Sequence, residues 1–162
     1  ILKNIKPETK ENIEFLLNRV LKNWNKSIEE LPFWFKDNYG IEKVKKADLV
    51  ILNFPLYWTS VPAILKGWID QVARAGKTFS YSAEGPKGLV TDKKVYLSIA
   101  SGAIFSEGPY KSYDFSESYL RTVLGFLGMT DVTTFRVEGT AIPDFAENAL
   151  PKALSSVEEF AF

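Results

Sequence analysis

Residues 48–74 read Asp-Leu-Val-Ile-Leu-Asn-Phe-Pro-Leu-Tyr-Trp-Thr-Ser-Val-Pro-Ala-Ile-Leu-Lys-Gly-Trp-Ile-Asp-Gln-Val-Ala-Arg. The stretch begins with an unbroken apolar run, Leu49–Leu52, which is typical of a strand covered on both faces in a parallel sheet. After Pro62 the apolar residues recur at steps of three and four, the spacing of one helical stripe: Ile64, Leu65, Trp68, Ile69 and Val72. A strand, a short turn and a helix make half of a βαβ unit, which indicates an α/β fold.

The turn between this strand and this helix lies at the carboxyl end of the strand, where open α/β sheets bind ligands. It contains Tyr57 and Trp58, aromatic residues in a place that is usually small and polar. A second turn, Ala100–Ala103, follows the predicted strand Lys94–Ala100, and its small residues leave the backbone amides uncovered. Both turns are expected at one edge of the sheet, where they suit a planar heteroaromatic ring such as isoalloxazine. The alternative is that the two aromatics only pack and that Gly102 only makes a turn.

The rest of the chain alternates between predicted strands and predicted helices. In chain order we expect a strand end at Ile1–Ile5, a helix at Ile13–Trp24, a loop or distorted strand at Leu31–Phe35, a helix at Gly40–Ala47, a long loop with a small hairpin at Gly76–Val90, a helix at Ser118–Phe126 ended by Gly128, an edge or terminal strand at Asp131–Val137, and a last helix within Pro143–Phe160. The last helix is expected to pack through Phe145, Ala149, Leu154, Val157 and Phe160. This order predicts a parallel sheet with right-handed crossovers. Only 47 residues precede Asp48, too few for two regular βα units, so we expect a compressed unit or a truncated amino-terminal part.

The composition excludes several classes of site. The 162 residues fit a single domain, 1–162, and the 20 basic residues balance the 20 acidic ones, so neither nucleic acid nor an anionic membrane is an expected partner. The chain has no Cys and no His, which excludes disulfides, thiol nucleophiles, zinc sites and Ser-His-Asp triads within it. The glycine-rich patterns of dinucleotide-binding and P-loop sites are also missing. Without an apolar run of about 18 residues or a signal-peptide pattern, a cytoplasmic protein is the default expectation.

Several motifs resemble one enzyme family. Phe54-Pro-Leu-Tyr-Trp58, followed by Val61-Pro-Ala-Ile-Leu-Lys-Gly-Trp-Ile-Asp70, looks like the flavin-contacting turn and following helix of flavodoxin-like quinone reductases. Two further motifs are similar to the FMN-dependent NADH azoreductase and NAD(P)H quinone reductase family: Ala73-Arg-Ala-Gly-Lys-Thr-Phe79 with Tyr81, Gly85-Pro86 and Gly88-Leu89 after it, and Leu124-Gly-Phe-Leu-Gly-Met-Thr-Asp-Val132. The resemblance runs in order from about Ala47 to Thr140. It implies a flavodoxin-like fold, a doubly wound parallel sheet with helices on both faces.

The resemblance also implies a function. It implies a homodimer that binds FMN near the subunit interface and transfers two electrons by a ping-pong route, in which NADH or NADPH gives hydride to flavin N5 and a quinone or azo compound then takes it. The flavin carries this chemistry, so no side chain is expected to be catalytic. The implied cofactor-binding residues form the two turns: Pro55, Leu56, Tyr57, Trp58, Thr59, Ala100, Ser101, Gly102 and Ala103. Phe79 and Tyr81 are expected to cover the substrate side, with Tyr81 as a substrate contact, and Phe105 to line the substrate pocket.

This sequence departs from the family pattern in three places. The second turn lacks the Arg of the common Ser-Arg-Gly-Gly pattern, and Phe105 stands where family members often have a His. The stretch Asn4–Asn12 has no serine where the family holds the FMN phosphate on a Ser-rich turn. The alternative hypothesis is therefore a non-catalytic binding or regulatory subunit that has lost the phosphate loop. An electron-carrier flavodoxin fits less well, because those carriers are strongly acidic and this chain is neutral.

Overall fold

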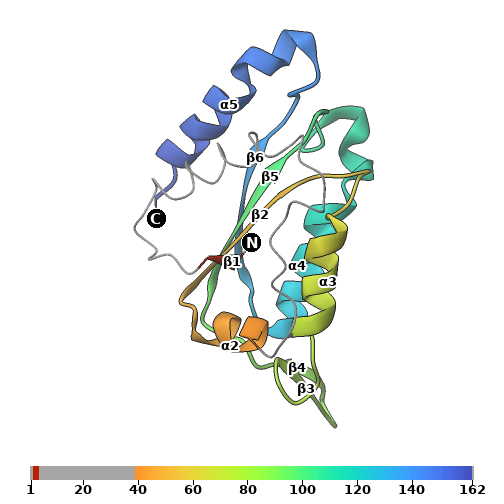
Figure 1. Ribbon diagram of the computed structural model, residues 1–162, viewed down its shortest axis with the longest axis vertical. Helices are drawn as coiled ribbons and strands as arrows, with labels where there is room; N and C mark the ends of the chain where they lie inside the picture. Colours follow the sequence, from red (N-terminus) through yellow and green to blue (C-terminus); the bar gives the residue numbers. More distant parts are fainter. Residues whose placement is uncertain (1, 4–38, 162) are drawn as a thin grey trace.

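A computed structural model describes residues 2–3 and 39–161 of the chain (Figure 1). The elements in chain order are β1 (Leu2–Lys3), α2 (Tyr39–Lys46), β2 (Leu49–Pro55), α3 (Ala63–Val72), β3 (Phe79–Ser82), β4 (Gly85–Gly88), β5 (Lys94–Ala100), the 3-10 helix η2 (Gly108–Tyr113), α4 (Phe115–Leu127), β6 (Asp131–Val137) and α5 (Pro143–Glu158). The elements predicted at Ile13–Trp24 and Leu31–Phe35, and the stretch Asn4–Asn12, lie outside the described residues.

The main sheet has the strand order β1-β2-β5-β6. β2 pairs with β5 in parallel from Leu49 opposite Lys94 onwards, and β5 pairs with β6 in parallel over its whole length. The predicted parallel sheet is therefore confirmed for these three strands, and β6 is the terminal strand of the described sheet. β1 differs, because its two residues pair with β2 in the antiparallel direction. A strand added at the edge of a sheet can run parallel or antiparallel to its neighbour, and antiparallel edge strands are common on otherwise parallel sheets.

Helices cover both faces of the sheet, with α3 and α4 on one side and α5 on the other (Figure 1). Successive side chains of a strand point to opposite faces, so β2 divides its residues between two cores. Val50, Leu52 and Phe54 join the core under α3 and α4, whereas Leu49 and Ile51 join the core under α5. The strands are apolar on both faces because both faces are covered, which explains the unbroken apolar run Leu49–Leu52.

The helix ends follow local sequence signals. α3 begins directly after Pro62, as predicted. α4 ends at Gly128, which has φ 105 and occupies the left-handed position that favours glycine. It begins at Phe115, three residues before the predicted start, because the Asp114 side chain caps it by accepting the N–H groups of Ser116 and Glu117. No helix in the described ranges is both long enough and apolar enough to cross a membrane.

α5 packs as predicted through part of its stripe. Ala149 and Val157 are buried against the sheet, and Phe160, just beyond the helix, contacts the rings of Tyr96 and Phe135. The expectation for Phe145 is wrong, since 51% of this side chain is exposed. Phe145 lies in the first turn of α5, beyond the last residue of β6, and the sheet gives it no surface to cover.

Candidate functional site

The two turns singled out in the sequence lie side by side at one edge of the sheet. β2 and β5 end opposite each other, with Pro55 paired with Ala100. The Leu56 amide continues this ladder and donates to the Ala100 carbonyl at 2.8 Å. We call residues 55–59 the aromatic turn and residues 100–104 the amide turn. Their predicted proximity is confirmed, because parallel neighbouring strands end at the same edge.

The aromatic turn is held in an unusual backbone conformation. Tyr57 and Ser60 exchange two backbone hydrogen bonds of 3.0 Å, which close a tight turn over the two residues between them. Those residues, Trp58 and Thr59, have φ values of 45° and 69°, in the left-handed region that residues with a side chain rarely adopt. Such conformations cost about 1–3 kcal/mol each and gather at binding sites. The turn leaves the Trp58 side chain 98% exposed, so its ring is available to a ligand and contributes little to the core.

The amide turn is anchored by its carbonyl groups. Its carbonyls accept from the turn after β6: that of Ser101 from the Thr140 hydroxyl at 3.1 Å, that of Gly102 from the Ala141 N–H at 3.0 Å, and that of Ala103 from the Gly139 N–H at 3.3 Å. In a trans peptide the C=O of one residue and the N–H of the next point in opposite directions, and none of the described peptide bonds is cis.

The next three amides therefore point away from the turn after β6, toward the side of the edge on which β2 ends. These are the N–H groups of Gly102, Ala103 and Ile104, and none of them donates a hydrogen bond within the described part of the chain. The expectation that Ser101 supplies a backbone donor is wrong, because its N–H donates to the Val137 carbonyl at 2.8 Å and continues the sheet ladder. The run of available donors is displaced by one residue toward Ile104.

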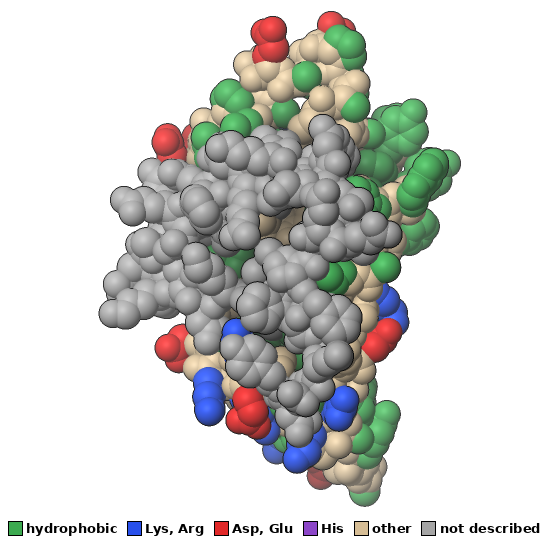
Figure 2. All heavy atoms as spheres, viewed as in Figure 1, with side chains coloured by type: hydrophobic (Ala, Val, Ile, Leu, Met, Phe, Trp, Pro, Cys, Tyr) green, Lys and Arg blue, Asp and Glu red, His purple; other side chains and the backbone are tan. Residues whose placement is uncertain are grey.

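Aromatic side chains border both turns. The Phe115 amide donates to the Thr59 carbonyl at 3.0 Å, which places the start of α4 against the aromatic turn. The rings of Phe105 and Tyr110 lie 6.4 Å apart, so Phe105 lies beside the 3-10 helix as well as next to the amide turn. Tyr110, Tyr113 and Phe115 are each about half exposed. Figure 2 shows hydrophobic side chains gathered at the upper right, where Figure 1 draws the loop after β2 and the 3-10 helix.

The hairpin β3–β4 does not join this edge within one chain. α3 runs back along the sheet, so the hairpin that follows it lies at the opposite end of the molecule (Figure 1). There Phe79 packs on Phe126 of α4, with ring centroids 4.8 Å apart, and Tyr81 is largely exposed. The expectation that Phe79 and Tyr81 cover the two turns is therefore wrong for residues of the same chain, because the length of α3 separates the hairpin from the turns.

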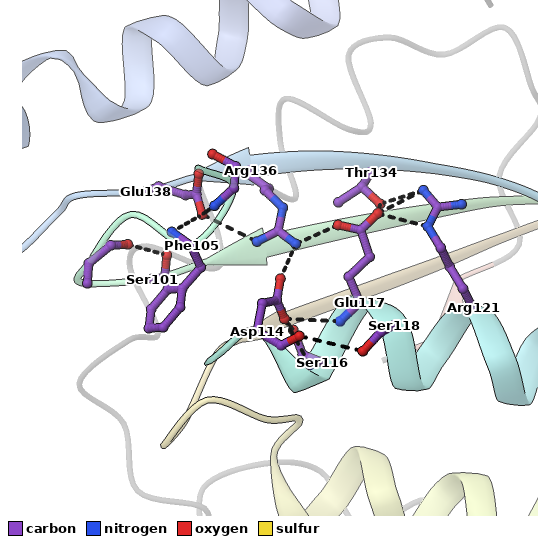
Figure 3. A network of polar contacts seen from close by, with 12 residues as sticks. Ser101, Phe105, Asp114, Ser116, Glu117, Ser118, Arg121, Thr134, Arg136 and Glu138 are labelled. Carbon is purple, nitrogen blue, oxygen red and sulfur yellow. Dashed lines mark hydrogen bonds and ion pairs between the residues drawn. The ribbon is translucent and has the colours of Figure 1, made fainter. Parts of the chain in front are cut away.

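A polar network that sequence reasoning missed lies directly behind the amide turn (Figure 3). Arg136, near the end of β6, pairs through Nη2 with Asp114 and with Glu117 at 2.5 Å, and through Nη1 with Glu138 at 3.3 Å. Glu138 Oε1 also accepts the backbone amides of Phe105 at 2.8 Å and Ser106 at 3.0 Å. The network therefore joins the loop after β5, the start of α4 and the end of β6.

The network changes the acidity of its members. Burial raises the pKa of Asp114, but hydrogen bonds from Ser116 and Arg136 outweigh it, so the pKa is lowered overall. Burial likewise opposes ionisation of Glu117, and hydrogen bonds from Arg136, Thr134 and Arg121 outweigh it and lower its pKa. Both carboxyl groups are thus held charged. The sequence signal was available at Asp114 and Glu117, because an N-cap residue followed three positions later by Glu is a helix-start pattern.

The donors at this edge fit an isoalloxazine ring. Its edge carries carbonyl oxygens and ring nitrogens, which accept from backbone N–H groups, and its flat face suits an aromatic neighbour. Three amides in one direction and an exposed indole beside them supply these contacts. Within residues 2–3 and 39–161 no group of three or more acidic side chains is placed to hold a metal ion.

A family model described as a flavodoxin-like fold matches residues 9–161. The chain belongs to the flavodoxin-like family. Among its curated relatives, an "FMN-dependent NADH:quinone oxidoreductase" of Herminiimonas arsenicoxydans is 47% identical over 120 residues, which is 74% of this chain and 59% of the relative. An "FMN-dependent NADH:quinone oxidoreductase 1" of Bacillus licheniformis is 43% identical over 126 residues, 77% of this chain and 60% of the relative. The flavodoxin-like chain thus spans about three-fifths of the length of these relatives.

Solved structures show the same likeness. An azoreductase from Bacillus anthracis str. Sterne is 38% identical, with a TM-score of 0.69 over 74% of this flavodoxin-like chain and 58% of that protein. The azoreductase AzrA is 31% identical, with a TM-score of 0.70 over 88% and 72% of the two chains.

Proposed function

We propose that this protein is an FMN-dependent oxidoreductase that passes electrons from NADH or NADPH to quinones or azo compounds. The observation that carries the proposal is the run of three amides, Gly102–Ile104, directed to the side on which the aromatic turn lies. The relatives named as NADH:quinone oxidoreductases and the azoreductase structures support the same cofactor and the same substrate classes.

The chain supplies binding and orientation in this proposal. When bound, FMN would supply the hydride chemistry between the nicotinamide and the acceptor. The amides of Gly102, Ala103 and Ile104 donate to the polar edge of the ring, while Tyr57 and Trp58 line its face. The half-exposed aromatics around η2 border the pocket in which donor and acceptor bind in turn. Cytoplasmic placement belongs to the same proposal.

A homodimer is part of the proposal as well. Phe79 and Tyr81 lie at the far end of their own chain, so they reach the pocket only from a second copy. Tyr81, in strand β3 of the hairpin, is 72% exposed, so its ring is open to contact by a second copy. Sedimentation or light scattering tests this part, with a dimer expected and a monomer contradicting it.

Anaerobic spectroscopy tests the activity. The protein is reconstituted with FMN, treated with NADH and then treated with a quinone. Bleaching of the flavin absorption by NADH and its recovery on adding quinone is the expected result. A protein that binds no FMN would instead support the non-catalytic subunit, and one that binds FMN but stays oxidised with both NADH and NADPH would contradict the oxidoreductase.

A further inference from the structure

Glu138 contacts more of the loop behind the amide turn than any other carboxylate does in the described part of the chain. Its Oε1 accepts the amides of Phe105 and Ser106 and lies 3.3 Å from Arg136 Nη1. The side chain is only 11% exposed, so water does not replace these contacts readily. No contact of Oε2 is described, so Oε1 alone makes all three of these contacts.

The two amides that Glu138 binds follow directly after the amides of the amide turn that have no acceptor. The amides of Gly102, Ala103 and Ile104 have no acceptor in the described residues, and the next two amides belong to Glu138. The Glu138 carboxylate therefore marks where the run of available donors ends. Without it the part-buried amide of Phe105 and the exposed amide of Ser106 lose their acceptor, and the loop is free to turn so that these amides bond elsewhere.

Arg136 fixes Glu138 in turn. Its Nη2 binds Asp114 and Glu117, which belong to the cap and first turn of α4, while its Nη1 reaches Glu138. The guanidinium is planar and rigid, so it transmits the position of α4 to the carboxylate that holds the loop. Two elements of fixed structure, β6 and α4, thus set the conformation of an irregular segment.

We propose that Glu138 is a positioning residue that selects which amides of the amide turn face the ligand, by capturing those of Phe105 and Ser106 and leaving those of Gly102–Ile104 available. The proposal rests on the function proposed above for its ligand, FMN, and on the geometry alone for the capture of the loop. Through Glu138, the β6–α5 turn helps to set the conformation of the amide turn, although the two are far apart in the sequence.

Two conservative variants of Glu138 show whether the position of its oxygen or its negative charge holds the loop. Glu138→Gln removes the charge but keeps an oxygen where Oε1 lies, with its NH₂ in the place of Oε2. Glu138→Asp keeps the charge but is shorter by one methylene and does not reach both amides. Glu117→Gln is the matched control, because it weakens another carboxylate contact of Arg136 without contacting the loop.

Hydrogen exchange of the amides of Phe105 and Ser106 is the first readout, measured without FMN. Glu138→Asp should speed their exchange about tenfold relative to the wild-type protein, while Glu138→Gln and Glu117→Gln stay within about threefold. Slow exchange in Glu138→Asp, or equally fast exchange in Glu138→Gln and Glu138→Asp, would overturn the capture of the loop.

The FMN dissociation constant, measured by fluorescence quenching, is the second readout. It should rise about tenfold in Glu138→Asp and stay within about threefold of the wild-type value in the other two variants. Equal affinity in Glu138→Asp and Glu138→Gln would overturn the effect on the ligand. If the wild-type protein binds no FMN, the proposed function fails, whereas the exchange experiment still decides whether Glu138 holds the loop.

Discussion

Trp58 combines a strained backbone with an exposed ring. Its φ of 45° is one that glycine adopts freely, and its side chain is almost entirely outside the core. A tryptophan in this conformation with an exposed ring contributes little to folding, so its position favours a role in binding. The same reasoning applies to the turn as a whole, since strain at a surface turn is more readily explained by a ligand than by stability.

Replacing Trp58 tests this separation of stability and binding. Trp58→Gly should leave the free energy of unfolding in urea within about 1 kcal/mol of the wild-type value, because the strain it relieves offsets the flexibility it adds. The same change should raise the FMN dissociation constant about tenfold, through loss of the ring contact. Trp58→Phe, which keeps a ring, should retain most of the affinity. A large loss of stability with unchanged FMN affinity would show a structural residue.

The sequence predicted that the two turns lie together, but not which of their amides are available as donors. The apolar runs placed Pro55–Thr59 and Ala100–Ala103 at one edge because strand ends in a parallel sheet coincide. The exact donors depend on which amides the ladder has already used, and Ser101 belongs to the ladder. The network around Arg136 was missed because two of its partners, Asp114 and Glu117, lie 22 and 19 positions away in the sequence. The assigned ligand contacts stay predictions.

The hairpin and α4 are joined by the close approach of two glycines. A Cβ on Gly88 would meet the backbone of Gly128 and lie 2.5 Å from the carbonyl carbon of Leu127. Val90 then donates to the Leu127 carbonyl at 2.9 Å and extends the same contact. The hairpin is thus docked on the end of α4 by backbone contact, which fixes it at the edge of the sheet opposite the two turns.

A pair of Gly→Ala substitutions tests this docking. Gly88→Ala should lower the free energy of unfolding by about 2–3 kcal/mol, because backbone atoms must move to admit the methyl group. Gly67→Ala, inside α3 with open space around it, should raise it by about 0.5–1 kcal/mol through helix propensity. Chemical denaturation measures both. Equal effects of the two substitutions would show that the hairpin is not held at Gly88.

Elements with a strong period were predicted closely and those set by single contacts were not. α3 and β5 follow directly from hydrophobic spacing and strand propensity. The start of α4 was missed because a side-chain cap decides it. Phe145 was misplaced because helical spacing does not tell how far the sheet extends beneath a helix.

At the scale of the whole molecule, the Arg136 network makes the free energy of unfolding depend on pH in the acidic range. Asp114 and Glu117 have pKa values below their ordinary values of 3.8 and 4.5, so the unfolded chain binds protons more readily than the folded one. Their contribution is therefore complete above those ordinary values and is lost as the pH falls through the lowered ones. Arg136 stays charged throughout, because its pKa is raised further.

The double variant Asp114→Asn, Glu117→Gln tests this dependence. Its free energy of unfolding at pH 7 should fall by about 2–4 kcal/mol, and its stability should change less than that of the wild-type protein between about pH 2 and pH 5. Asp70→Asn is the control, because its exposed pair with Lys66 is worth no more than about 1 kcal/mol. Parallel acid profiles for the wild-type protein and the double variant would contradict the assignment.

The α/β fold with a parallel sheet followed from the order of the elements, as expected when helices alternate with buried strands. The position of the β3–β4 hairpin could not be predicted in this way. A loop after a helix can pack on any nearby surface, and the spacing of residues in the sequence does not show which surface it uses. The assignment of residues 1–162 to one domain stays a prediction.

In the proposed function, the aromatic turn and the amide turn bind a flavin ring together. NMR titration of ¹⁵N-labelled protein with FMN tests it most directly, because each amide reports its own environment. Saturable shifts are predicted at the amides of Trp58 and Thr59 and at those of Gly102, Ala103 and Ile104. Saturable binding that leaves these five amides unmoved, or no saturable shift at all, would contradict the account.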